Sequence, residues 1–236
     1  MKKSRIATLI VFFVLIPLTL IVGSRLSGRA FYVTSTLVIV ELLIPFFLAF
    51  EGRRPQAREL VVLAVMCALA VAGRVAIPIP SFKAIFGIIM IAGIAFGPES
   101  GFLVGAISAL ASNFFYSQGP YTPWQMMAYG AGGMLAGFVF AKGRLPRKPV
   151  IMGIFGFLAV TLFVGPLLDT CSVFLVMSRI SLKGAMAFYI SGFPVNLRQA
   201  VATAIVLLVL GKPLLEKLDR IKTKYGILDD EGRKEA

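Results

Sequence analysis

The chain has 236 residues, of which 58% are hydrophobic and 15% are charged, and its mean hydropathy is +0.89. This composition excludes an ordinary soluble domain, which would need far more polar surface. The formal net charge of +13 would suggest a nucleic-acid partner in a soluble protein, but membrane proteins hold Lys and Arg on their cytoplasmic side. Several apolar stretches reach about 20 residues, the length that crosses a bilayer core of roughly 30 Å. The sequence therefore predicts an all-α integral membrane protein.

The first apolar stretch follows a basic start, as a cleavable signal peptide would. It lacks a small-x-small cleavage site, because Gly23-Ser24-Arg25 is followed by Leu26, so we expect it to be retained. Charge clusters, Gly-Pro pairs and polar loops divide the chain into eight predicted transmembrane helices. The fourth is short for a full crossing and is expected to be tilted or packed against its neighbours. The predicted ranges are 6–23, 31–50, 59–78, 84–97, 100–117, 123–141, 150–177 and 188–210.

The basic residues indicate the orientation in the membrane. With a cytoplasmic amino terminus, the inside segments hold most of the 24 Lys and Arg residues. Loops rich in Lys and Arg stay in the cytoplasm, so we predict a multi-pass cell-membrane protein with both termini cytoplasmic. These inside segments are 1–5, 51–59, 97–100, 142–148 and the chain from 212 onward.

The last segment, 212–236, is predicted to be a cytoplasmic basic tail. Leu214, Leu218 and Ile221 recur at helical intervals with charges between them, which is typical of a short amphipathic helix at the membrane surface. A solvated basic tail held near anionic lipid is the alternative.

Small residues repeat at short intervals on four of the predicted helices. Helices in lipid associate through close contact at such residues, because burying apolar surface gains nothing there. Each repeat predicts either internal packing of a compact bundle or a face that docks another membrane subunit. The repeats are Ala64, Ala68 and Ala72; Gly93 and Gly97; Gly101, Gly105 and Ala109; and Gly133 and Gly137.

Polar side chains occur at a common depth on four predicted helices. Counting about 1.5 Å per residue places Arg74, Asn113, Gln125 and Arg198 roughly 20 to 24 Å from the cytoplasmic ends of their helices. Asp169 lies slightly higher. Polar groups in apolar spans mark cavities or ligand pathways, so a polar cup that opens outward is expected. The loops add Lys83, Tyr116, Gln118, Tyr121, Trp124, Arg179 and Lys183.

The same residues have structural interpretations. Asp169 could form an ion pair with Arg198 or Arg74 that only holds helices together. Trp124 and Tyr121 could be ordinary interfacial anchors. Glu41, in the middle of the second predicted helix, has no obvious partner in the sequence.

The sequence offers little for catalysis or metal binding. It has no histidine, and Cys67 and Cys171 lie in apolar runs where a thiol is usually packing material. A disulfide framework, a His-based metal site and a resident cofactor are not expected. No Walker A loop occurs either, so energy for any transport must come from another subunit.

The middle of the chain resembles a known family. The run 97–126 contains Gly-Pro-Tyr-Thr-Pro-Trp-Gln at 119–125, and it looks like the third and fourth helices and joining loop of energy-coupling factor (ECF) transporter S components. Gly-Phe-Pro-Val-Asn-Leu at 192–197 and Lys-Thr-Lys-Tyr-Gly at 222–226 resemble the family's last helix and tail. The similarity covers about residues 58–226.

This resemblance implies a six-helix subunit that binds a vitamin or related micronutrient from outside. It works with a transmembrane T component and two ATPase subunits. The family's first helix docks the T component through small residues spaced four apart, which correspond here to Ala64, Ala68 and Ala72. The division of the chain is then two extra N-terminal helices (1–50), the six-helix core (51–211) and the tail (212–236).

Three functions remain open at this point: a solute-binding transport subunit, a small membrane enzyme with Asp169 as its sole candidate acid, and a scaffold subunit of an envelope complex. For the first, basic residues near the cup favour a ligand with a phosphate or carboxylate, and aromatic residues favour a flat ring. The loop pattern looks closest to cobalamin-type S components. The predicted substrate contacts are Arg74, Asn113, Tyr116, Gln118, Tyr121, Trp124, Gln125, Asp169, Asn196 and Arg198.

Overall fold

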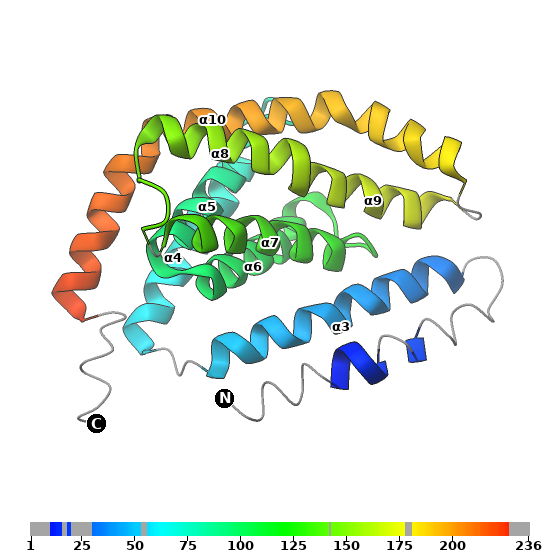
Figure 1. Cartoon of the computed structure of the whole chain (residues 1–236), viewed down its shortest axis with the longest axis horizontal. Helices are drawn as coiled ribbons and strands as arrows, with labels where there is room; N and C mark the ends of the chain where they lie inside the picture. Colours follow the sequence, from blue (N-terminus) through cyan, green and yellow to red (C-terminus); the bar gives the residue numbers. More distant parts are fainter. Residues whose placement is uncertain are drawn as a thin grey trace.

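The computed structural model describes residues 10–15, 18–19, 30–52, 56–141, 143–177 and 181–226, and it contains helices but no strand within these ranges (Figure 1). The prediction of an all-α protein is confirmed for this part of the chain. Most of the first predicted helix and the end of the predicted tail lie outside the described residues. The elements are η1 (Val11–Leu15, a π-helical segment), α3 (Ala30–Gly52), α4 (Ala57–Val75), α5 (Ile85–Phe96), α6 (Pro98–Tyr116), α7 (Thr122–Phe140), α8 (Pro149–Ala159), η2 (Val160–Val164, π-helical), α9 (Gly165–Val176) and α10 (Leu182–Tyr225).

Two helical runs in the described residues are long and apolar enough to span a membrane by length and composition alone. They cover 149–176 and 182–225. Helices α4, α6 and α7 have 19 residues each, but polar and glycine residues lower their average hydropathy. Helix α6 packs against α4 and α7, and all three pack against α5, so only part of each needs an apolar surface. The exact number of eight crossings therefore stays a prediction.

Helix α5 lies at the centre of the bundle. All of its 12 residues are buried, and it packs against α4, α6, α7 and α10. At about 1.5 Å per residue it spans only some 18 Å, less than the bilayer core. Of the two expectations for this short helix, the structure shows packing against its neighbours.

Glycines let the backbones of α5, α6 and α7 meet. A Cβ added at Gly101 would lie 2.5 Å from the carbonyl oxygen of Gly133 and 2.7 Å from the Cα of Gly93. A Cβ at Gly133 would overlap the carbonyl oxygen of Gly101 and lie 2.7 Å from Ile89 Cγ2. Contact this close is the main source of helix association in lipid. The glycine repeats on these three helices therefore serve internal packing.

The span predicted at 150–177 is formed by α8, η2 and α9 in succession. Pro166 lies at the start of α9, directly after the π-helical segment. Proline donates no backbone hydrogen bond, and its ring clashes with the carbonyl four residues earlier. A π-helical turn relieves such a clash, and turns of this kind often occur at functional sites.

Helix α10 is a single helix of 44 residues, whereas the sequence predicts a transmembrane helix and a separate tail helix. It bends towards its C-terminal end (orange to red in Figure 1), and Pro213 lies within this part of the helix. Beyond Pro213, Leu215 and Leu218 are buried against the bundle. The predicted apolar face is thus used for packing on the protein.

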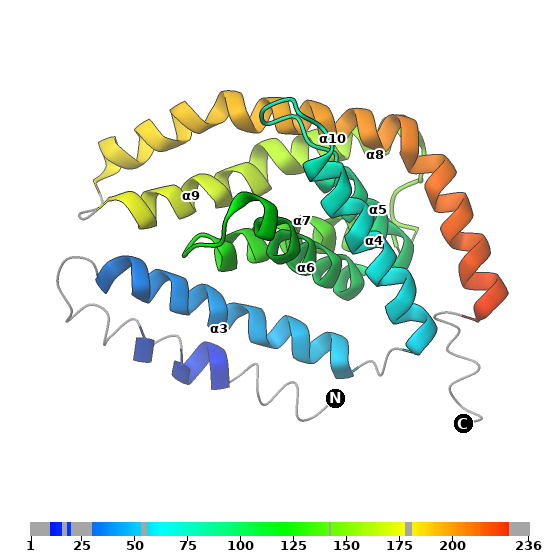
Figure 2. The ribbon, with the colours of Figure 1, turned by 180° about the vertical axis from the view of Figure 1, so that it is seen from behind.

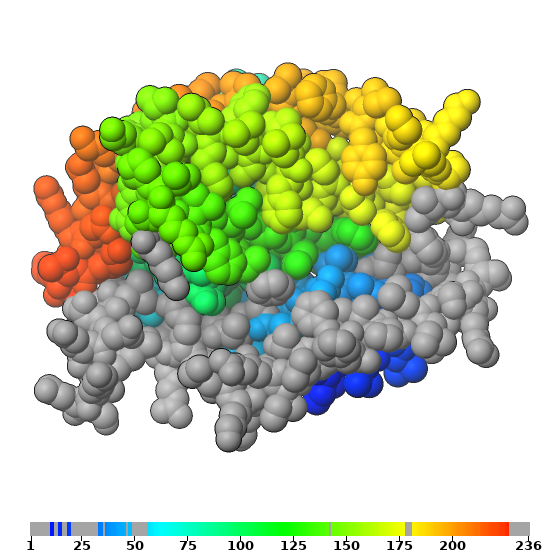
Figure 3. Space-filling view, viewed as in Figure 1, coloured from blue at the N-terminus to red at the C-terminus, as the bar shows by residue number. Residues whose placement is uncertain are grey.

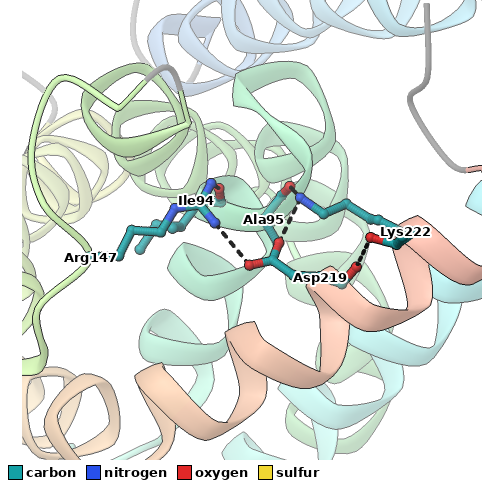
Figure 4. A network of polar contacts seen from close by, with 6 residues as sticks. Ile94, Ala95, Arg147, Asp219 and Lys222 are labelled. Carbon is teal, nitrogen blue, oxygen red and sulfur yellow. Dashed lines mark hydrogen bonds and ion pairs between the residues drawn. The ribbon is translucent and has the colours of Figure 1, made fainter.

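A polar network holds this end of α10 to the end of α5 (Figure 4). Asp219 forms ion pairs with Arg147 at 3.2 Å and with Lys222 at 2.8 Å. Arg147 also donates to the carbonyl oxygen of Ile94 at 3.2 Å, and Lys222 donates to that of Ala95 at 2.8 Å. These carbonyls belong to the last turn of α5, where backbone carbonyl groups have no hydrogen-bond partner within the helix. The helix dipole also places a partial negative charge at this end. The two cations stabilise that end and fix α10 beside it.

Helix α3 packs along α6, α7 and α9. In Figure 3 its blue side chains lie below the yellow-green side chains of α8 and α9. Ile39 of α3 packs in a small cluster with Trp124 and Cys171. Glu41 accepts a hydrogen bond from Thr19 Oγ1 at 2.5 Å, a partner that the sequence does not reveal. Helix α3 is therefore joined to the bundle, and the described part of the segment before it is joined to α3.

The glycine contact predicts an asymmetric pair of substitutions. Gly133→Ala should destabilise the detergent-purified protein by about 1–3 kcal/mol, because its methyl group overlaps the backbone of α6. Gly132→Ala is the matched control, since its Cβ would meet only the movable side-chain atoms of Val164 at 3.0 Å and Met90 at 4.0 Å. Thermal melts should show a clearly larger loss for Gly133→Ala. Equal melting temperatures would show that the backbones are not in close contact.

Candidate ligand-binding site

A cavity of about 260 Å³ lies where several helix ends meet. The segment 76–84 forms one wall, and Figure 2 shows this loop lying against the middle of α10. Irregular backbone at membrane depth is tolerated where it lines a cavity. The cavity is lined by Arg74, Ser81, Lys83, Ile85, Phe86, Tyr116, Tyr129, Val160, Gly165, Leu168, Val195, Asn196 and Gln199.

Arg74, in the last turn of α4, is held in place from several sides. Its Nη1 donates to Ser112 Oγ at 2.5 Å and to Asn113 Oδ1 at 2.9 Å. Its guanidinium carbon lies 4.8 Å from the ring centroid of Tyr116 and 5.6 Å from that of Tyr129. The hydroxyl of Tyr116 donates to the Arg74 carbonyl at 3.0 Å. Cation–π contacts and hydrogen bonds together fix the guanidinium at the cavity wall.

Asn113 is the fully buried centre of this network. Its Nδ2 donates to Thr122 Oγ1 at 3.1 Å and to Gln125 Oε1 at 2.8 Å, while its Oδ1 accepts from Arg74. Thr122 Oγ1 donates in turn to Gln118 Oε1 at 2.9 Å. The network thus joins α4, α6 and α7, with every polar atom of the Asn113 side chain paired.

Two amides of α10 form the opposite wall. Asn196 donates from Nδ2 to Asp169 Oδ2 at 2.7 Å, and Gln199 donates from Nε2 to the carbonyl oxygen of Lys83 at 2.7 Å. Asp169 fits close to α10 because residue 192 is glycine, where a Cβ would overlap the carboxylate. In the described structure the side-chain oxygens of Asn196 and Gln199 accept no hydrogen bond. They are available to a ligand that donates.

Lys83 brings a second positive charge to the cavity. Its Nζ donates to the carbonyl oxygen of Ile77, within the same loop, and lies 5.9 Å from the ring centroid of Tyr116. Ser81, two residues earlier, has a φ of +58°, which is uncommon for a residue with a side chain. The loop is therefore folded back on itself beside the cavity.

The structure brings together only part of the predicted contact set. Arg74, Tyr116 and Asn196 line the cavity. Asn113, Gln125 and Asp169 stand behind them as hydrogen-bond partners. Gln118 donates to the carbonyl oxygen of Leu110 in α6 at 2.9 Å, and Tyr121 donates to that of Ser117, in the loop between α6 and α7, at 2.7 Å.

Two predicted contacts lie elsewhere. Trp124 is buried against Phe174, with ring centroids 5.5 Å apart, and is not at the cavity wall. Arg198 is exposed and donates from Nε to Pro194 O at 3.3 Å on its own helix. Within the described residues it forms no ion pair with Asp169, which binds Asn196 instead. Arg179 lies outside the described residues.

The sequence analysis missed Phe86, Tyr129 and Gln199 as wall residues. One signal was present for Gln199. Residues three apart share a helix face, whereas residues two apart lie on nearly opposite faces. Asn196 and Gln199 therefore point to the same side of α10, and Arg198 cannot join Asn196 there.

Comparison with known proteins decides the family. Residues 55–216, more than half of the chain, match the model of the ECF-type riboflavin transporter S component. The chain belongs to the ECF S-component family. No match was found among curated proteins or among solved structures.

Membership of this family settles the broad class of function. ECF S components are substrate-binding membrane subunits of vitamin transporters and are not enzymes. The family implies association with a T component and the ATPases of the ECF module. The hypothesis of a small membrane enzyme with Asp169 as its acid is therefore wrong. The match names riboflavin and does not confirm the expected cobalamin specificity.

The Asn113 network predicts a stability effect at this site. Asn113→Ala should lower the free energy of unfolding by about 1–3 kcal/mol, because it removes the hydrogen bonds to Arg74, Thr122 and Gln125 and leaves Gln125 Oε1 without its partner. Phe114→Ala is the control, since the neighbouring Phe114 side chain is 77% exposed on the outside of the bundle. Thermal melts in detergent should separate the two variants. A control variant that melts as low as Asn113→Ala would argue against a special role for the network.

Proposed function

We propose that this S component binds a flat heteroaromatic vitamin of the riboflavin type in the cavity between α4, α7 and α10. The observation that carries the proposal is the lining itself: rings of Phe86, Tyr116 and Tyr129 together with the amides of Asn196 and Gln199. Aromatic walls favour a planar ring system. Two free amide oxygens suit a ligand that presents N–H or O–H donors, as the ring imide and the ribityl chain of riboflavin do.

The size of the cavity supports a compact ligand. Ligand pockets generally measure about 300–1,000 Å³, and this cavity of about 260 Å³ lies just below that range. A corrin macrocycle would need a much larger and more open site. The lining and the family match therefore both favour riboflavin over cobalamin.

Riboflavin binding can be followed by quenching of its own fluorescence on the purified protein. Gln199→Ala should weaken binding roughly two- to twelvefold, the value of one neutral hydrogen bond. Gln56→Ala removes the same kind of side chain from an exposed position at the start of α4 and should leave affinity unchanged. If cobalamin binds and riboflavin does not, the riboflavin proposal fails.

We further propose that the cavity faces the outside of the cell and that both termini are cytoplasmic. The basic residues support this orientation, because most of them lie in the segments that it places inside. The cavity is formed by the last turn of α4 and the first turn of α5, so it lies at the opposite end from these segments. Substrate would then enter from outside and leave through the assembled transporter.

The alanine repeat of α4 is our proposed contact with the T component. Ala64, Ala68 and Ala72 are all exposed, whereas Leu63 and Met66 of the same helix are buried in the bundle. The glycine repeats serve internal packing, whereas the small side chains of this repeat are exposed on the outside of the bundle. Small residues let a partner helix approach closely.

Bulk on this face should block assembly without affecting the site. Ala68→Leu should reduce copurification of the T component severalfold and leave riboflavin affinity of the isolated subunit nearly unchanged. Ala187→Leu adds the same bulk to an exposed position of α10 and should assemble normally. Loss of folding in Ala68→Leu would instead mean that the repeat packs within the bundle.

A further inference from the structure

We propose that the ligand of this cavity carries an oxyanion, a phosphate or a carboxylate, which binds between Arg74 and Lys83. The inference rests on the proposed function only in taking this cavity as the substrate site. It adds a charge to the ligand class, because riboflavin itself is neutral.

The first step is the charge balance of the cavity. Arg74 and Lys83 both line it, and no acidic residue does. Among the described residues, the acid that stands behind the wall is Asp169, which accepts a hydrogen bond from Asn196. Neither cation forms an ion pair in the described structure. The site therefore holds two positive charges without a protein counter-ion.

The other acids whose side chains the structure describes lie elsewhere. Glu59 and Glu99 lie in the first turns of α4 and α6, at the opposite ends of these helices from Arg74 and Tyr116. Glu216 and Asp219 lie near the end of α10, and Glu41 binds Thr19. Among the described side chains, none of these acids lines the cavity.

The second step is the free hydrogen-bonding capacity of Arg74. A guanidinium has five N–H donors. The two of Nη1 are used by Ser112 and Asn113, and no bond from Nε or Nη2 is formed to the described residues. These two nitrogens make up the side-on edge that binds carboxylate or phosphate through two parallel hydrogen bonds. The bonds through Nη1 leave that edge unused.

The third step is that the guanidinium of Arg74 is held in a fixed position before a ligand binds. The side-chain amide of Asn113 is held in one orientation, because its Nδ2 donates to Thr122 and Gln125. Its Oδ1 therefore keeps Arg74 in one position. The rings of Tyr116 and Tyr129, with centroids 4.8 and 5.6 Å from the guanidinium carbon, attract its positive charge but add no negative charge. A fixed positive charge without a counter-ion is energetically unfavourable in a membrane protein, and a bound anion would neutralise it.

The experiment compares riboflavin with riboflavin 5′-phosphate on the full-length protein in detergent at low salt. The phosphate ester should bind about tenfold to a hundredfold more tightly, as expected for charged hydrogen bonds. Arg74→Gln and Lys83→Gln should each remove most of this preference, measured as the ratio of the two dissociation constants for each variant. Arg144→Gln is the matched control, because Arg144 is exposed and donates to Phe138 O at the other end of α7. Lys83→Gln keeps the test decisive if Arg74→Gln does not fold.

Inorganic phosphate separates the two proposals. Equal binding of both flavins to the unmodified protein would overturn the oxyanion inference and leave the riboflavin proposal standing. If neither flavin binds, but inorganic phosphate raises the melting temperature of the unmodified protein and not of Lys83→Gln, the flavin proposal fails and the oxyanion inference stands. If neither flavin binds and phosphate gives no such difference, both are wrong.

Discussion

The contact of three helix backbones at Gly93, Gly101 and Gly133 is the constraint on which the other features of the bundle depend. Lipid gives helices no reason to bury apolar surface, so dispersion at close range must hold α5, α6 and α7 together. This contact lies at the end of α5 away from the cavity. It fixes the directions of the three helices, and with them the positions of Phe86, Tyr116 and Tyr129 at the opposite end. The close glycine contact at one end of these helices thus positions the aromatic residues that line the cavity at the other end.

Polar groups connect that wall to the rest of the bundle. Asn113 joins α4, α6 and α7 through hydrogen bonds, and Gln199 joins α10 to the loop after α4. Buried polar groups are tolerated in such a setting only when they are satisfied. The atoms behind the wall meet this condition. At the cavity, hydrogen-bonding capacity remains in the Nε–Nη2 edge of Arg74 and in the oxygens of Asn196 and Gln199. Within the described part of the chain, four buried atoms on residues that do not line the cavity also have no partner: Glu41 Oε2, Ser108 Oγ, Trp124 Nε1 and Thr161 Oγ1. What sets the cavity apart is that its free groups face one shared space that a ligand can enter.

The sequence predicts these features unequally. Hydropathy and helical rise place residues along the membrane normal, so Arg74, Asn113 and Gln125 were expected at one depth, and the structure joins them in one network. Depth carries no information about direction around a helix axis. Arg198 therefore entered the predicted set although it faces outward, and Gln199 was missed. The continuity of α10 through Pro213 was also hidden, because packing of Leu215 and Leu218 on the bundle outweighs the helix-breaking tendency of proline. Substrate identity depends on cavity shape, which no sequence pattern gives.

The extra N-terminal helices bear on how such a subunit could still work within a transporter. Helix α3 packs on α6, α7 and α9, and its Ile39 covers Trp124. The exposed alanines of α4 lie on a helix that packs mainly against α5 and α6. Because these alanines are exposed with α3 in place, α3 does not cover the proposed docking face. A T component could approach α4 without displacing α3, and α3 would then move together with the core because it is attached to three of its helices. The docking face that we propose on α4 is thus compatible with the presence of α3.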